Sequence, residues 1–238
     1  MTTVEQKALS DKFEIIFQNS DFVVFDKPEG LNFHSEDNEA GFVVLASAQL
    51  GISQLYSVHR LDKMTSGLII LAKSSKIAND FTKLFENKEV QKFYLALSLR
   101  KPKKKQGWIK GDMGSARRGS YMLLKTKENQ AITQFISTSL RVGERLFLVK
   151  PHTGKTHQIR VALKSIGAPI AGDIRYANAD EAKKEDRGYL HAFALSFCLN
   201  GEDFSFTCSP KNGERFLSQE AQDKLQGYAK PWELFKKS

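Results

Sequence analysis

The residues best suited to chemistry in this sequence lie in a short charged segment. Asp62 is the carboxylate of that segment; it follows His59 and Arg60 and directly precedes Lys63. Positive charge nearby favours the ionised form of an aspartate at neutral pH. An ionised carboxylate can act as a nucleophile or a general base, so Asp62 is the candidate catalytic residue. The plainer alternative is a structural ion-pair or turn residue, which a lone aspartate in a loop usually is.

The element that must position Asp62 is the apolar run that follows it. Residues 68–72 read Leu-Ile-Ile-Leu-Ala and are bounded by Gly67 and Lys73. A run of branched aliphatic residues of this length predicts a strand buried on both faces. The charged segment is therefore expected to be held by a rigid part of the core.

A second group of candidates lies on a strand expected over residues 90–99. Its residues alternate in type, and one side carries Lys92 and Tyr94 together with small neighbours. That side is typical of a cleft wall, where a planar base can stack on the tyrosine. A half-exposed tyrosine on an ordinary sheet face is the alternative.

A third group lies in residues 150–160, which lead into a helix expected to end near Ile166. Arg160 falls in the first turns of that helix, where its side chain can reach a loop. The alternative is an ordinary surface cation. His152 and His157 have no Cys or His companions at metal-ligand spacing, so we expect no metal.

The remaining elements follow from local patterns. Residues 100–118 carry eight Lys and Arg against one acid, and we interpret them as a loop that contacts phosphates, or else as a solvated face. Trp108 is expected to anchor this loop. We expect strands at 13–17, 22–25, 121–125, 132–138 and 146–149, a hairpin turning at Asn200 and Gly201, and helices at 42–50, after a cap at Ser75, and at 214–226.

Composition narrows the class of partner. The chain has 238 residues, a net charge of +9 and a pI near 9.4, which favours a polyanion such as nucleic acid over an acidic protein. No leader and no long apolar run is visible, so we expect a cytoplasmic protein with no membrane segment. The expected hairpin register leaves Cys198 and Cys208 apart, without a disulfide.

Three segments resemble, in order, the motifs of the RluA-type pseudouridine synthases, enzymes that isomerise uridine within RNA. They are residues 59–68 around Asp62, residues 92–96 around Tyr94, and residues 153–160 ending at Arg160. Lys155 stands where arginine is more usual in the family, and the charge is kept. Three motifs in one order are far more specific than any single short pattern.

The resemblance implies an α+β fold: the pseudouridine synthase fold, with a mixed, largely antiparallel sheet, flanking helices and a central basic cleft. It implies a loosely ordered segment over residues 1–12, a single catalytic domain over 13–238, and no separate RNA-binding module ahead of it. We expect an enzyme that acts as a monomer without a cofactor. Its partner would be RNA, with ribosomal RNA favoured slightly over transfer RNA.

The resemblance also implies residue roles. Asp62 would be the catalytic carboxylate, Arg160 would keep it anionic, Tyr94 would pack on the flipped uracil, and Arg60 would fill the gap left in the RNA. The expected RNA-binding residues are thus Arg60, Tyr94, Arg160, Lys92 and His59.

Two other functions are compatible with the same residues. One is a nucleoside glycosidic hydrolase, although such enzymes usually need a second carboxylate or a metal. The other is an RNA-binding or assembly factor that keeps the fold without turnover, which the intact Asp62, Tyr94 and Arg160 argue against.

Overall fold

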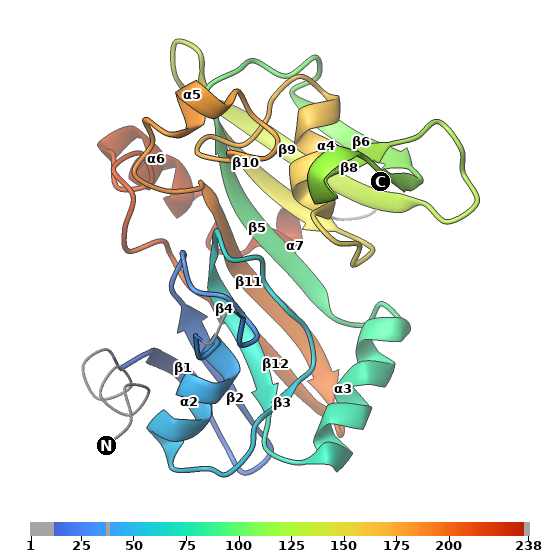
Figure 1. Ribbon diagram of the computed structural model, residues 1–238, viewed down its shortest axis with the longest axis vertical. Coiled ribbons are helices and arrows are strands. Elements are labelled where there is room, and N and C mark those ends of the chain that lie inside the picture. Colours follow the sequence, from blue (N-terminus) through green and yellow to red (C-terminus); the bar gives the residue numbers. More distant parts are fainter. Residues whose placement is uncertain (1–11, 37–38, 236–238) are drawn as a thin grey trace. The chain divides into compact units, whose positions relative to one another are not determined.

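The computed structural model describes residues 12–36 and 39–235. The chain divides into two compact units, one formed by residues 1–90 and 195–208 and the other by residues 91–194 and 209–238. Figure 1 shows the ribbon of both units, coloured from blue at the N-terminus to red at the C-terminus. The expected loose segment 1–12 lies outside the described residues except for Lys12.

The first unit is built on an antiparallel sheet. Its elements are β1 (Glu14–Gln18), β2 (Phe22–Lys27), α2 (Phe42–Leu50), β3 (Tyr56–Ser57), β4 (Thr65–Ala72), α3 (Ser75–Glu86), the second half of β11 (Leu190–Leu199) and β12 (Glu202–Thr207). Strand β2 pairs with β1 and, from Phe22 opposite Ala72 to Lys27 opposite Gly67, with β4. Strand β3 pairs with the end of β4, and β12 pairs with β11.

The core of the first unit is rich in phenylalanine. Every residue of β4 is buried, as the apolar run predicts. The rings of Phe22, Phe81, Phe197 and Phe204 lie 5.1–5.7 Å apart between centroids, mostly edge to face, an arrangement that adds to the burial of their area. The segment that follows Asp62 is therefore fixed in the buried core of this unit.

One boundary of each helix in this unit can be compared with the prediction: the end of α2 is confirmed, and the start of α3 is corrected. Helix α2 stops at Gly51, which has the left-handed conformation that glycine adopts without strain. Helix α3 is capped by Ser74, whose side chain accepts the N–H of Ile77, and not by Ser75 as expected. Either serine could cap a helix by its residue type. Ser74 is the cap because its own backbone is extended (φ −145°, ψ 158°), as a cap residue requires.

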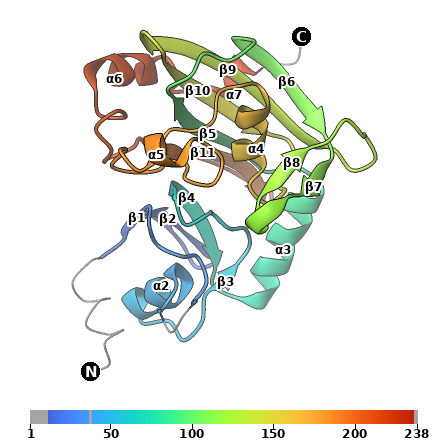
Figure 2. The ribbon, with the colours of Figure 1, turned by 45° about the horizontal axis from the view of Figure 1, so that its top comes forward.

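The second unit contains the other elements. They are β5 (Gln91–Ser98), β6 (Gln106–Gly111), β7 (Met113–Ser115), the 3-10 turn η1 (Arg117–Gly119), β8 (Tyr121–Leu123), β9 (Ala131–Arg141), β10 (Glu144–Pro151), α4 (Gln158–Ser165), α5 (Ala179–Ala182), the first half of β11, α6 (Gln219–Gln226) and α7 (Pro231–Leu234). The strands run β5-β10-β9-β6, each pair antiparallel, and β7 pairs with β8 in a small separate sheet. Figure 2 shows β6, β9 and β10 side by side. These strands and helices confirm the predicted α+β class.

Three expectations for the second unit were wrong. Residues 100–118 are not a loop throughout: Gln106–Gly111 form β6, because they pair along β9 from Gln106 opposite Ile136 to Gly111 opposite Ala131. Trp108 lies on that strand with 50% of its surface exposed, so it does not anchor a loop. The closing helix α6 begins at Gln219, where the Ser218 side chain accepts the N–H of Ala221, and not at residue 214.

The register of β5, β10, β9 and β6 defines two faces of the second-unit sheet. Tyr94 lies opposite Val149, which lies opposite Phe135, so these three share one face. Gln158 at the start of α4 donates to the Thr133 hydroxyl at 3.0 Å, which places α4 on that same face. Trp108 lies opposite Gln134, which faces the other way. We refer to these as the Tyr94 face and the Trp108 face.

The last hairpin has the predicted geometry. Strands β11 and β12 are joined by Asn200 and Gly201, both with positive φ (53° and 83°), as in the turn that Asn-Gly favours. Cys198 and Cys208 do not form a disulfide. No helix in the described part of the chain is long and apolar enough to cross a membrane.

Candidate active site

The loop that carries Asp62 is tied to the first-unit sheet at several points. The Asp62 carbonyl accepts the N–H of Thr65 at 2.9 Å, and the Lys63 carbonyl accepts the N–H of Gly30 at 2.7 Å. Leu61 is 5% exposed, whereas Asp62 beside it is partly exposed. The backbone is thus held at Asp62 and at the residue after it, while Asp62 stays partly exposed, as a reacting group requires.

A buried lysine also holds this loop, through hydrogen bonds to backbone carbonyls. Lys27, at the end of β2, is 0% exposed, and its Nζ donates to the carbonyls of Pro28 at 2.8 Å and Thr65 at 3.1 Å. Burying an ammonium group is unfavourable unless its protons are bonded. The bond to Thr65 connects the turn after β2 to the first residue of β4, three positions beyond Asp62.

His59 is a structural support of this loop. Its Nε2 lies 2.9 Å from the backbone nitrogen of Ile70 in β4, so Nε2 accepts that N–H and the ring carries its proton on Nδ1. The ring also packs on Phe85 of α3, with centroids 5.1 Å apart. The expected contact of His59 with RNA stays a prediction, and the structure adds a role in holding the loop.

Replacing His59 with alanine is expected to lower the free energy of unfolding by about 1–3 kcal/mol, because the buried N–H of Ile70 loses its acceptor. Chemical denaturation measures the effect. The exposed His34, in the same unit, provides a control, and its alanine variant should change stability by less than about 0.5 kcal/mol. Equal stabilities for the two variants would contradict the supporting role of His59.

Arg160 is not a surface cation. Its side chain is 8% exposed and forms a fork with Asp173, whose side chain is fully buried: Nε donates to Oδ2 at 2.7 Å and Nη2 donates to Oδ1 at 2.9 Å. Oδ1 of Asp173 also accepts the N–H groups of Arg175 and Tyr176 at 3.1 and 3.2 Å. Such a paired fork fixes the plane of the guanidinium far better than a single contact.

The turn that presents Asp173 depends on a glycine. Gly172 has φ of 74°, and a Cβ there would lie 1.8 Å from the carbonyl oxygen of Arg187. Only glycine fits both the conformation and the space. Gly172 and Asp173 therefore place the partner of Arg160, a residue that the sequence analysis did not identify.

Tyr176 completes this cluster in the second unit. Its ring centroid lies 4.9 Å from the guanidinium carbon of Arg160, and its hydroxyl accepts the N–H of Tyr121 at 2.9 Å. The same hydroxyl lies 2.9 Å from Nδ1 of His157, the residue with left-handed conformation that precedes α4. Burial raises the pKa of Tyr176, so its hydroxyl keeps its proton at neutral pH. The cluster links β8 to the start of α4.

Lys92 and Tyr94 lie on β5 and share the Tyr94 face. Lys92 Nζ is 3.8 Å from the position that a Cβ on Gly154 would occupy, so Lys92 reaches the segment that leads into α4. Burial lowers the pKa of Lys92. Tyr94 itself is partly exposed. The second unit thus brings together Lys92 and the 153–160 segment, as two of the three motifs require.

Asp62 and Arg60 belong to the first unit, and Lys92, Tyr94 and Arg160 belong to the second. Arg60 is exposed in the loop beside Asp62, where a substrate can reach it. The expected pairing of Asp62 with Arg160 therefore stays a prediction. The described partner of Arg160 is Asp173.

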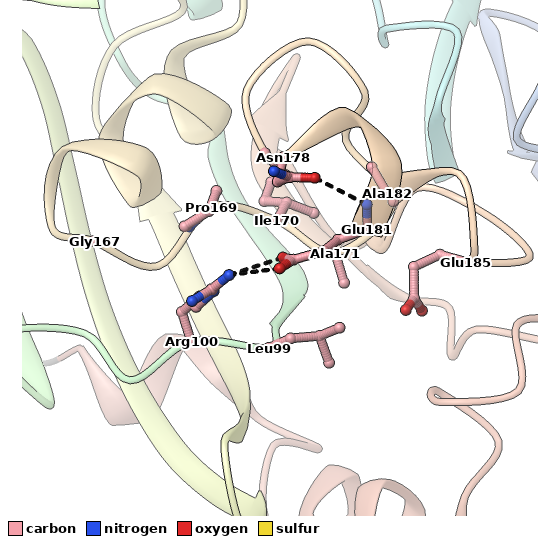
Figure 3. Close-up of a pocket in the computed structure, with 12 residues that line it drawn as sticks. Leu99, Arg100, Gly167, Pro169, Ile170, Ala171, Asn178, Glu181, Ala182 and Glu185 are labelled. Atoms are coloured by element: carbon pink, nitrogen blue, oxygen red, sulfur yellow. Dashed lines mark hydrogen bonds and ion pairs between the residues drawn. The ribbon is translucent and has the colours of Figure 1, made fainter.

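A pocket of about 320 Å³ lies elsewhere in the second unit and contains none of these residues. Figure 3 shows Arg100 and Glu181 facing each other in its wall, joined by hydrogen bonds of 2.8 and 2.9 Å. Glu185 in the same wall accepts two bonds from Arg215, at 2.6 and 2.9 Å. Both carboxylates are thus ion-paired, and Nη2 of Arg100 donates to a protein carboxylate in this structure.

Comparison with known proteins identifies the family. A family model described as RNA pseudouridylate synthase matches residues 21–165, more than half of the chain, including all three motifs as far as Arg160. An uncharacterized RNA pseudouridine synthase of Haemophilus influenzae is 46% identical over 217 residues, which cover 91% of this chain and 96% of that protein. Ribosomal large subunit pseudouridine synthase D of Borreliella burgdorferi is 30% identical, covering 86% and 67%.

Other similarities agree with this result. tRNA pseudouridine synthase C of Haemophilus influenzae is 31% identical, covering 77% of this chain and 86% of that protein. The solved structure of human RNA pseudouridylate synthase domain containing 4 is similar in fold, with a TM-score of 0.72 at 24% identity, over 94% of this chain and 97% of that one. The family match and the sequence relatives show that this chain belongs to the RNA pseudouridylate synthase family.

Proposed function

We propose that this protein converts uridine to pseudouridine in a structured RNA, with Asp62 as the catalytic carboxylate. The observation that carries the proposal is the loop of Asp62, which is held by backbone bonds at Asp62 and Lys63 and by buried Lys27, while Asp62 stays partly exposed. A rigidly held yet accessible carboxylate is what catalysis on a bulky substrate needs. Membership of the family supplies the reaction class.

The reaction is an isomerisation. The bond from the anomeric carbon of the sugar to N1 of uracil breaks, the base turns, and a bond forms from the same carbon to C5. C5 loses a proton and N1 gains one, so atoms and electrons balance without an oxidant or reductant. Asp62 adds to the substrate or removes a proton from it, and both roles require the ionised carboxylate.

The target uridine must leave the stack of bases to reach a carboxylate. Arg60, exposed beside Asp62, would occupy the gap that the uridine leaves. Tyr94 would pack on the extruded uracil, and Arg160, with its guanidinium oriented by Asp173, would stabilise the charge of Asp62. Lys92 would contact the RNA backbone beside the 153–160 segment.

Replacing Tyr94 with alanine is expected to lower kcat/KM for RNA by roughly tenfold to a hundredfold, because stacking on an aromatic ring contributes about 1–3 kcal/mol per base. Tyr94→Phe keeps the ring and should retain most of the activity. Steady-state kinetics on a modified RNA measures both. If the phenylalanine variant were as impaired as the alanine variant, the hydroxyl and not the ring would carry the role of Tyr94.

The proposed target is ribosomal RNA. One relative is named for transfer RNA, whereas relatives from Borreliella burgdorferi, Rickettsia bellii and Haemophilus influenzae are named for the ribosomal large subunit, which supports ribosomal RNA as the target. We expect the purified chain to form pseudouridine in a large-subunit ribosomal RNA transcript and not in transfer RNA transcripts. Chemical mapping of pseudouridine in both, and in RNA from cells with and without the gene, tests this.

The outcomes of that experiment separate the possible functions. Pseudouridine in transfer RNA alone would correct the target and keep the reaction. Release of free uracil would instead identify a glycosidic hydrolase. Unmodified RNA in both mixtures, with tight RNA binding, would identify a binding factor.

A further inference from the structure

We propose that the Trp108 face of the second-unit sheet is a second RNA-binding surface, on which an unpaired base of the substrate RNA stacks. The inference rests on the proposed function and extends it, since it assigns RNA contacts to the face opposite Tyr94. The surface is formed by Trp108 and Lys110 of β6, Gln134 of β9, Lys150 of β10 and His152 just beyond it.

The aromatic part of this surface is Trp108 with His152. The Trp108 ring is 50% exposed, and its centroid lies 4.7 Å from that of His152 with 33° between the ring planes. His152 is in turn held by Gln134, at 3.2 Å between Nε2 and Oε1. An exposed indole supported by a neighbouring ring on a sheet surface is the arrangement on which RNA-binding sheets stack bases.

The charges around Trp108 favour RNA over a protein partner. Lys110 Nζ lies 4.9 Å from the Trp108 ring centroid. On β10, Lys150 Nζ donates to Oε1 of Gln91 in β5 at 2.9 Å. Lys103, Lys104 and Lys105 lead directly into β6. Within β6, β9 and β10 the acid is Glu144, at the far end of β10, where it is 6% exposed and lies 3.6 Å from Arg215.

Two acids on the helices of this unit are also ion-paired. Glu220 of α6 accepts two bonds from Arg141, at 2.9 and 2.7 Å, and Glu233 of α7 lies 3.8 Å from Lys230. A phosphate chain would therefore meet the lysines of β6 and β10 along the strands of this face. Strand β6 ends the strand order of this sheet, so a single strand of RNA can pass around its outer edge from one face to the other (Figure 2).

The chain offers a direct optical test, because Trp108 and Trp232 are its two tryptophans. In the full-length Trp232→Phe variant, titration with an oligoadenylate of about ten nucleotides should quench the fluorescence of Trp108 in a saturable way, since stacked bases quench indole emission. In the Trp108→Phe variant the remaining Trp232 should be quenched little. Equal quenching of both variants, or none in the first, overturns the inference.

Affinity measurements give a second test. Trp108→Ala should weaken binding of the oligonucleotide by about tenfold, and Trp108→Tyr should restore most of the loss. Lys110→Gln should reduce the slope of log affinity against log salt by about 0.7, while Lys183→Gln, at an exposed lysine after α5, should leave it unchanged. Thermal melts establish that each variant is folded.

The two proposals fail separately. If the protein forms pseudouridine but Trp108→Ala keeps the parent affinity and kcat/KM, this inference is wrong and the proposed activity stands; the face is then open to a protein partner. If Trp108 is quenched and Trp108→Ala weakens binding although no pseudouridine forms, the surface is confirmed and the proposed activity is wrong.

Discussion

Replacing Asp62 with asparagine is expected to lower the rate of pseudouridine formation by about a thousandfold or more, because an amide can neither add to the sugar nor accept the proton. The loop should survive, since the bond to Thr65 uses the backbone carbonyl of Asp62 and not its side chain. RNA affinity should stay near that of the parent. Single-turnover assays on the modified RNA, with binding measured in parallel, test this.

A matched variant controls for loss of charge in the same unit. Asp80 lies on α3, 3.6 Å from Lys83 on the helix surface, and Asp80→Asn makes the same chemical change away from the Asp62 loop. It should keep full activity, because exposed pairs of this kind contribute little. If Asp62→Asn turned over within tenfold of the Asp80→Asn variant, Asp62 would not be the catalytic carboxylate.

The second large effect concerns Arg160 and Asp173. Arg160→Met removes the cation that pairs with the buried Asp173 carboxylate, and Asp173→Asn removes the charge that accepts the two bonds of the buried Arg160 guanidinium. Each single variant should lose about 3–5 kcal/mol of stability. The double variant buries no charge at this pair, and the asparagine Oδ1 can still accept the N–H groups of Arg175 and Tyr176. Much of the lost stability should therefore return.

Activity in the same set of variants separates structure from catalysis. If Arg160 stabilises the charge of Asp62, the double variant should be folded and still about a hundredfold or more less active than the parent. Denaturant unfolding and kinetics on the same samples give both values. Activity that returned together with stability would show that Arg160 serves the fold alone.

Local pattern predicted most of the elements that position the site. The buried run after Asp62 became β4, the helix before Gly51 became α2, and the turn at Asn200 and Gly201 became the β11–β12 hairpin. Each depends on periodicity or turn chemistry within a few residues, which a sequence displays directly. The exception is β6, where the density of lysine and arginine around Trp108 indicated a loop. Pairing with β9, whose paired residues lie 20 to 30 positions away, made that segment a strand.

The sequence by itself determined the family, the reaction class and Asp62 as the candidate carboxylate, because the motifs are contiguous stretches of a few residues. The tertiary structure decided the partners of those residues: Asp173 for Arg160, the Ile70 N–H for His59, and two backbone carbonyls for buried Lys27. Most of these bonds join residues more than ten positions apart. Hydrogen bonds of that kind leave no periodic signal in a sequence, and they form only when the fold brings donor and acceptor within about 3 Å.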